Sequence, residues 1–280
     1  MKKSAAVILS LMLALMFALA ACGSSGNGEN SANGGGNDST SGGGGESKFK
    51  LVTPGKFTFA ASGEFKPFSY MKGGKMVGYD IAVGQAIAKK LGLEPNQQKA
   101  KFAGIITGVQ THRYDAAVAS HTITPERSKH VNFSQPYYYS GPVAYVRPDS
   151  KIKTKQDLEG KKICVSRGST YVKTAKQYTK DIPKVDSDVT ALQALSKGHY
   201  DVVITDAITG KTAIKNGANI KPIIHFGVSK QAVAVAKDHD KLLKAVNQAL
   251  TELKKSGKLK KLAEKWVGVD ITQPPKNANQ

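Results

Sequence analysis

Short apolar runs alternate with helical stretches through residues 49–280, and this alternation constrains the fold more than any other feature. The runs have the length and the β-prone composition of buried strands. The stretches between them place apolar residues at helical spacing, and one of them ends at Gly92. Strands that alternate with helices predict an α/β protein with largely parallel sheets. The predicted strands include 56–61, 116–119 and 202–204, and the predicted helices include 79–91, 240–255 and 258–266.

Residues 5–21 form the only long apolar run, and they lie at the N-terminus behind Lys2 and Lys3. A charged start, an apolar middle and small residues at the exit are typical of a secretory signal peptide, predicted here as residues 1–21, although a signal anchor would look similar. The sequence Leu19-Ala20-Ala21-Cys22 resembles the lipobox of bacterial lipoproteins, in which cleavage precedes an acylated cysteine. We therefore expect lipidation at Cys22, and an exported protein anchored to the outer face of the cell membrane.

Residues 22–48 comprise Cys22 and a segment in which 20 of 26 residues are Gly, Ser or Asn. This composition predicts a flexible linker of roughly 30 Å between the membrane and the folded part. Cys164 is then the only thiol left for the folded part, so no internal disulfide is possible. Its apolar neighbours predict a buried strand residue rather than a reactive thiol.

The chain has 41 Lys and Arg against 21 Asp and Glu, a formal charge of +20. The lysines are scattered without interleaved aromatic residues, so we expect no nucleic-acid partner. Attraction to anionic lipid or wall polymer explains the charge better, and a solvated surface explains it best. No His-Glu-x-x-His or paired Cys-x-x-Cys occurs, and no nucleophile motif is recognisable. We therefore expect no metal, no cofactor and no catalytic residue.

Two segments of the chain share a pattern. In 112–120 and again in 198–206, Tyr-Asp enters a four-residue apolar strand that ends at a polar residue, Ser120 or Asp206. Chance similarity of two buried strands is the alternative explanation. Because ligands of open α/β sheets lie beyond the carboxyl ends of strands, two lobes would present Ser120 and Asp206 across a cleft.

Arg127 lies in the most informative stretch, Thr122-Ile-Thr-Pro-Glu-Arg127, which follows a predicted strand exit. A helix is expected to begin at Pro125, with Thr122 capping it or donating a hydrogen bond. At such a place a guanidinium can bind a carboxylate through two parallel hydrogen bonds.

These residues and several other segments resemble the extracellular solute-binding proteins of family 3, the polar amino-acid receptors of ABC importers. The resemblance spans about 56–268, and the order and spacing of its segments are more specific than any one of them. Ala82 departs from the pattern, because the family usually has a second acidic residue there. The segments are Phe65-Lys-Pro-Phe68, Gly78-Tyr-Asp-Ile81, Phe102-x-Gly-Ile-Ile, Ser120-x-Thr122 with Arg127, Phe133-Ser-x-Pro-Tyr, Gly168-Ser-Thr170, Asp201 with Asp206, and Lys265-Trp-Val-Gly268.

The resemblance implies a two-lobe periplasmic-binding-protein-like fold of type II, with the ligand cleft between the lobes. Lobe 1 would comprise residues 49–141 and 232–270, and lobe 2 residues 142–231, with 271–280 as a C-terminal tail. By the same resemblance, Arg127 grips the α-carboxylate of an amino acid, assisted by the N–H groups of Thr122 and Thr170. Asp206 takes the α-ammonium, helped by the Ser120 carbonyl and the Thr122 hydroxyl, and it can also cap the helix that follows it.

Phe65 and Phe102 match the two residues that flank the ligand, although core packing would also suit them. Ser62 stands where relatives that bind cationic amino acids have an acidic residue. A neutral polar side chain would be satisfied by Ser62 and Ser166, so glutamine or a similar ligand is predicted over arginine. Glu64 is the substitute carboxylate if arginine binds instead.

The predicted function is that of a monomeric receptor that captures a polar amino acid and delivers it to a membrane permease and its ATPase. The alternative is an enzyme on the same scaffold, of the arogenate or prephenate dehydratase type. Such an enzyme needs a general acid. Glu64 is the only candidate in the sequence, and its neighbour Lys66 suggests a surface loop. A basic protein that binds wall polymer or nucleic acid is a third possibility, and it would show steep salt dependence.

Overall fold

A computed structural model describes residues 49–275 of the chain. The predicted signal peptide, the lipidation site Cys22 and the linker lie outside the described residues, as does 276–280 of the predicted tail. No helix between Phe49 and Pro275 combines the length and the apolar character needed to cross a membrane.

Lobe 1 is built on a five-stranded sheet in the order β5-β1-β6-β13-β7. Strand β1 pairs in parallel with β5 and β6, and β13 pairs antiparallel with β6 and β7. The inner strands β1 and β6 are buried on both faces and are mainly apolar, whereas the edge strand β5 is polar and largely exposed or half-buried. The strands are β1 (Lys56–Ala61), β5 (Glu94–Lys99), β6 (Ala116–Thr122), β7 (Val131–Ser140) and β13 (Ser229–Ala236).

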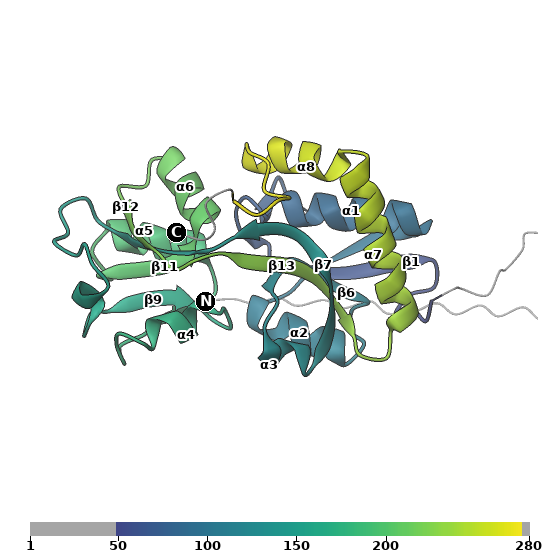
Figure 1. Cartoon of the computed structure of the whole chain (residues 1–280), viewed down its shortest axis with the longest axis horizontal. Helices are drawn as coiled ribbons and strands as arrows, with labels where there is room; N and C mark the ends of the chain where they lie inside the picture. The colour runs from purple at the N-terminus through teal and green to yellow at the C-terminus, as the bar shows by residue number, and fades with distance from the viewer. Residues whose placement is uncertain (1–48, 276–280) are drawn as a thin grey trace, which may run out of the picture. The chain divides into compact units, whose positions relative to one another are not determined.

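Helices cover both faces of this sheet, with α1, α7 and α8 on one side and α2 and α3 on the other (Figure 1). The apolar stripe of α7 includes Leu242, Val246 and Leu250, which pack into the same core cluster as the strands. Ile271, the first residue of the predicted C-terminal tail, is buried in the same cluster. The start of the tail is therefore packed against lobe 1. The helices are α1 (Tyr79–Leu91), α2 (Phe102–Gln110), α3 (Pro125–Ser128), α7 (Asp240–Lys255) and α8 (Lys258–Val267).

Lobe 2 has a second five-stranded sheet in the order β10-β9-β11-β8-β12, and successive strand residues point to opposite faces of it. In β11, Val202 and Ile204 join one core cluster and Val203 joins the other. Cys164 in β9 is fully buried, as expected. The strands are β8 (Pro142–Val146), β9 (Ile163–Ser166), β10 (Lys184–Val185), β11 (Val202–Asp206) and β12 (Lys221–His225), and the helices are η1 (Gln156–Leu158), α4 (Tyr171–Ala175), α5 (Asp188–Ser196) and α6 (Ala207–Lys215).

Two connections join the lobes, and they run side by side. One passes from β7 to β8 at Gly141, and the other passes from β12 to β13 through Gly227. A Cβ on Gly141 would lie 2.0 Å from the Gly227 carbonyl oxygen, so a side chain cannot fit there without movement. The close approach of two backbones therefore requires glycine at position 141.

The predicted elements agree with the observed ones at 56–61, 79–91 and 240–255. The predicted strands at 116–119 and 202–204 extend further, to Thr122 and Asp206, so each includes the polar residue at its exit. The third sheet was not anticipated. It is a small antiparallel sheet of β2 (Glu64–Phe65), β3 (Ser69–Lys72) and β4 (Lys75–Val77).

Candidate ligand-binding cleft

A small cavity lies between the two lobes, and concave sites at the interface of two lobes are common places for a small ligand. Most residues predicted from the sequence line it, and they come from both lobes. Asp206 does not line it. The predicted lining residues are Ser62, Phe65, Phe102, Ser120, Thr122, Arg127, Ser166 and Thr170, and the structure adds Glu64, Ser169, Tyr171, Asp186 and Asp188.

Contacts between the lobes close the rim of the cavity. Lys101 Nζ of lobe 1 lies 3.0 Å from an Asp186 carboxylate oxygen of lobe 2. Lys173 and Glu126 form a second, longer ion pair of 3.8 Å, and Ser187 Oγ donates to the Glu64 carbonyl at 3.4 Å. The described structure is therefore a closed conformation.

The Arg127 guanidinium is fixed between the lobes. Its Nη1 donates to the Thr122 carbonyl, and its Nη2 donates across the cleft to the Gly168 carbonyl, both at 2.9 Å. These bonds use two of the five N–H donors of a guanidinium. Burial lowers the pKa of Arg127 to about 10, so the group stays charged at neutral pH. The remaining donors can meet an anionic group of a ligand.

The prediction that Thr122 caps α3 is wrong. Thr124 is the cap, and its hydroxyl accepts from the Arg127 N–H at 3.1 Å. Pro125 occupies the first helical position, so the cap is the residue directly before it. Thr122 instead ends β6 and holds the guanidinium through its carbonyl.

Ser120 adopts a left-handed backbone conformation, with φ of 57°. Its N–H donates to the Tyr137 hydroxyl, and its own hydroxyl donates to buried Asp80. Such a conformation is uncommon for a residue other than glycine, and it persists where surrounding contacts fix it. These contacts occupy the N–H group and the hydroxyl of Ser120. They do not involve its carbonyl group, which is the group predicted to contact the ligand.

Asp206 ends β11 and caps α6, because its carboxylate accepts from the N–H groups of Ile208 and Thr209. It is 1% exposed, and burial raises its pKa to about 6. The capping role expected from the sequence is confirmed. Asp206 is not among the residues that line the cavity, so its contact with a ligand stays a prediction.

The two predicted flanking aromatic residues are each supported by a second ring. Phe65 stacks on Phe68 with ring centroids 5.1 Å apart, and Phe102 stacks on His121 at 4.4 Å. Burial and the nearby Arg127 charge hold the pKa of His121 well below its usual range, so its ring is neutral. Phe102 thus lies between a neutral imidazole and the Arg127 guanidinium, which is 5.7 Å from its centroid.

Two carboxylates of the cavity wall, Asp186 and Asp188, were not predicted from the sequence. Glu64, which the sequence offered both as a surface-loop residue and as the substitute carboxylate for arginine, belongs to β2, lines the cavity and forms an ion pair with Lys99 at 3.2 Å. Asp188 is 6% exposed and accepts a hydrogen bond from the Thr205 hydroxyl. Burial raises the pKa of Asp188. The only sequence signal was the helix start at Ser187-Asp188, which says nothing about a cavity.

Two α/β lobes that enclose a polar cavity, with one fixed guanidinium in its wall, define a two-lobed solute-binding protein. The model of the bacterial extracellular solute-binding proteins, family 3, matches residues 57–269, and the chain belongs to this family.

Relatives cover most of the chain. It is 33% identical to the L-cystine-binding protein TcyJ of Escherichia coli (strain K12), over 80% of this chain and 87% of TcyJ. Two structures of an ancestral arginine-binding protein, one bound to arginine and one to glutamine, are 36% identical to it with TM-scores of 0.72. The alignment with the arginine-bound structure covers 76% of this chain and 98% of that structure. The alignment with the glutamine-bound structure covers 77% of this chain and 99% of that structure. An ancestral amino-acid-binding protein, a precursor of cyclohexadienyl dehydratase, is 31% identical with a TM-score of 0.71, over 76% of this chain and 96% of its own.

Proposed function

We propose that this protein captures a polar amino acid outside the cytoplasm and delivers it to the permease of an ABC importer and, through it, to the ATPase. The observation that carries the proposal is the charged, half-buried Arg127 guanidinium in the wall of a cavity between the lobes. The relatives are named as cystine-binding and arginine-binding proteins, which supports the proposal that the solute is an amino acid.

In this proposal Arg127 grips the α-carboxylate, assisted by the backbone of Thr122 and Thr170. Asp206 receives the α-ammonium after a small rearrangement, together with the Ser120 carbonyl and the Thr122 hydroxyl. A zwitterion needs one fixed cation and one fixed anion shielded from water, because their attraction strengthens as water is excluded. Arg127 belongs to lobe 1 and Asp206 to lobe 2, so a ligand held by both favours the closed form.

A thermal-shift screen of the full chain tests this function. The probes are the twenty amino acids together with cystine and ornithine. Binding to the native state raises its melting temperature, so at least one polar amino acid should give a dose-dependent increase. Arg127→Ala should abolish the increase, whereas Arg113→Ala, which removes an exposed arginine over the Tyr114 ring, should retain it. If no probe shifts the melting temperature, the proposal is wrong.

We propose a binding protein rather than a dehydratase. The relatives reported above are named as binding proteins, although one is a precursor of an enzyme. The observation in favour of an enzyme is Asp188, a buried carboxyl with a raised pKa in the cavity wall. A dehydratase would convert prephenate or arogenate, and we expect no product from either substrate.

We propose further that Cys22 carries acyl chains, which would hold a monomeric receptor at the outer face of the cell membrane. The family is extracellular, and the lipobox-like sequence supports the anchor. Two acyl chains satisfy the requirement for stable anchoring.

A further inference from the structure

Asp188 is the one carboxylate in the described cavity wall that has no cationic partner among residues 49–275. The other two lining acids are neutralised, Glu64 by Lys99 and Asp186 by Lys101 and Arg167. Asp188 has a hydroxyl partner, Thr205, but forms no ion pair. It is 6% exposed, so water does not replace the missing cation.

A second group in the same wall also lacks a partner. Ser166 Oγ, at the end of β9, is buried and makes no hydrogen bond of standard geometry among the described residues, although it is close enough to the Asp188 carboxylate to lower the pKa of that group. Buried hydroxyls are normally satisfied, so this one is available to a ligand that enters the cavity. Ser166 and Asp188 therefore form a polar corner of lobe 2 with one unpaired anion.

We propose that the bound amino acid has a cationic side chain, a guanidinium or ammonium, which pairs with Asp188. The inference rests on the proposed function, because it assumes that Arg127 and Asp206 hold the main-chain groups. With those charges paired, a neutral ligand leaves Asp188 buried and alone, whereas a cationic one neutralises it. Phe65 lines the same cavity and favours a cation further through the ring face that Phe68 does not cover. Glutamine, the ligand predicted from the sequence, was chosen without knowledge of this carboxylate.

Calorimetric titration of the full chain with arginine and citrulline tests the proposal. Citrulline has the size of arginine but a neutral ureido group, so the pair isolates the charge. We expect arginine to bind at least about tenfold tighter, since a charged hydrogen-bonded pair contributes more than a neutral one. Asp188→Asn should bring the two affinities to within about threefold by weakening arginine. Asp181→Asn, the same change at an exposed residue of lobe 2, should leave the preference intact.

The outcomes separate this inference from the proposed function. If no amino acid binds, the proposed function fails. If citrulline or glutamine binds as tightly as arginine, the function stands and the cationic ligand is wrong. If Asp188→Asn weakens arginine, citrulline and glutamine equally, Asp188 is the partner of the α-ammonium and the proposal is also overturned.

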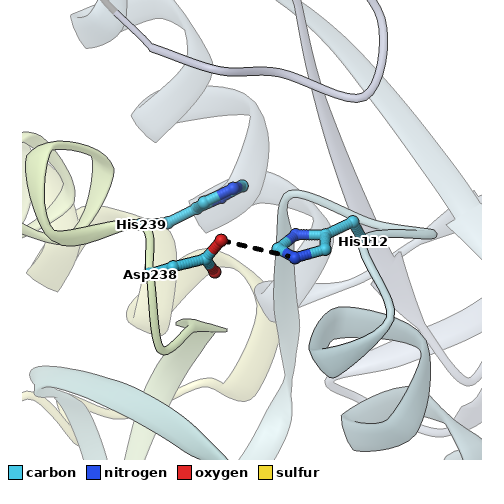
Figure 2. A group of neighbouring side chains, drawn as sticks. All are labelled: His112, Asp238 and His239. Carbon is cyan, nitrogen blue, oxygen red and sulfur yellow. Dashed lines mark ion pairs between the residues drawn. The ribbon is translucent and has the colours of Figure 1, made fainter.

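A different observation concerns a cluster at the far end of α2, in lobe 1. His112 follows this helix, and Asp238 and His239 precede α7; Figure 2 shows the three side chains together. His112 Nε2 lies 3.5 Å from an Asp238 carboxylate oxygen, and one ligand atom from each residue lies within 4.8 Å of the others. His239 is 8% exposed, yet neither of its ring nitrogens has a hydrogen-bond partner among the described residues.

We infer independently that His112, Asp238 and His239 bind a divalent transition-metal ion such as Zn²⁺. Imidazole nitrogens and a carboxylate are typical zinc ligands, at about 2.0–2.2 Å. Ligand atoms of a tetrahedral zinc are roughly 3.5 Å apart, so the exposed His112 and Asp238 side chains need to move by only about 1 Å. A metal would also satisfy one nitrogen of buried His239, whose present lack of a partner is costly. The ion would join the end of α2 to the start of α7.

Titration of the chelator-treated full chain with zinc chloride tests the metal site. We expect one saturable site per chain, and a melting temperature that rises with zinc and falls again with chelator. His112→Ala and Asp238→Asn, both at exposed positions, should weaken binding at least about tenfold. The control His130→Ala removes an exposed histidine elsewhere in lobe 1 and should have no effect. Absence of saturable binding, or equal binding by the His112 variant, would overturn the inference.

Discussion

Carbonyl groups of both lobes hold the Arg127 side chain in position. We therefore expect substitution of Arg127 to weaken ligand binding more than substitution of any other residue of the cavity. Arg127→Ala should weaken amino-acid binding by about 2–5 kcal/mol, because the ligand carboxylate would then be buried without a partner. Arg127→Lys keeps the charge but loses the planar fork, so it should recover only part of the affinity. Calorimetry of both variants checks the order. Equal affinity of Arg127→Lys and the natural protein would contradict the proposed bidentate contact.

Asp80 has the clearest pH effect, because burial raises its pKa to about 7 while the Tyr137 and Ser120 hydroxyls donate to it. The folded protein holds this proton more tightly than the unfolded chain, whose carboxyl titrates near 4. The contribution of Asp80 to stability is therefore full below pH 4, and it is lost as the pH rises to about 7.

Comparison of the natural protein with Asp80→Asn, which cannot titrate, isolates this effect. We expect the difference in free energy of unfolding to shift in favour of the variant between pH 4 and pH 7, and then to level off. Urea unfolding at pH 4, 5.5 and 7.5 measures it. Parallel pH profiles for the two proteins would show that the carboxyl is not buried as described.

At the scale of the element, α6 depends on Asp206 for its first turn. Asp206→Ala should therefore destabilise the folded protein as well as weaken binding, since loss of such a cap costs about 0.5–2 kcal/mol. Asp206→Asn separates the two roles, because asparagine caps helices as well as aspartate does but carries no charge. We expect Asp206→Asn to retain the stability measured by urea unfolding while losing affinity for amino acids. Unchanged affinity in this variant would remove Asp206 from the binding site.

The strands and helices of the two cores could be predicted because burial imposes a strong pattern on their sequences. The run Val202–Ile204 is apolar throughout because both faces of its sheet are covered, and the stripe of α7 reflects a single buried face. The hairpin β3–β4 gave no such signal, since Lys72 and Lys75 are exposed. Its position is decided by packing against the remainder of lobe 1, which a local pattern does not encode.

Most residues that line the cavity could be named from the resemblance, and Asp188 could not. Asp188 meets Thr205 because α5 begins beside the ends of β9 and β11, which pair in lobe 2. Residues 166, 188 and 205 are far apart in the sequence, and nothing in their spacing brings them together. Specificity therefore depends on the part of the site that tertiary structure alone reveals.

At the scale of the whole molecule, Gly141 controls how the two connections between the lobes pass each other. Gly141→Ala should destabilise the folded protein by about 1–3 kcal/mol, because its methyl group must displace the Gly227 carbonyl. Thermal unfolding should show a decrease of several degrees. Gly104→Ala is a matched control, since a Cβ there meets no atom within 4 Å, and alanine favours a helix. Equal melting temperatures for the two variants would contradict the close backbone approach.

Membrane attachment is predicted to depend on a single atom, the Cys22 sulfur. Cys22→Ser should leave export possible but abolish lipidation, so the protein should appear in the medium or the soluble extracytoplasmic fraction. Cell fractionation and mass spectrometry of the N-terminus measure both properties. A Ser variant that is cleaved and still fractionates with membranes would rule out the acyl anchor.

One contact that closes the rim, the ion pair of Glu126 with Lys173, joins two side chains that do not line the cavity. Its contribution is the same for every amino acid inside, because it does not need the solute as a partner. A substitution there would change the residence time of all solutes by one common factor and leave their ranking unaltered. Natural selection could thus adjust how long this receptor retains its cargo without altering which cargo it chooses.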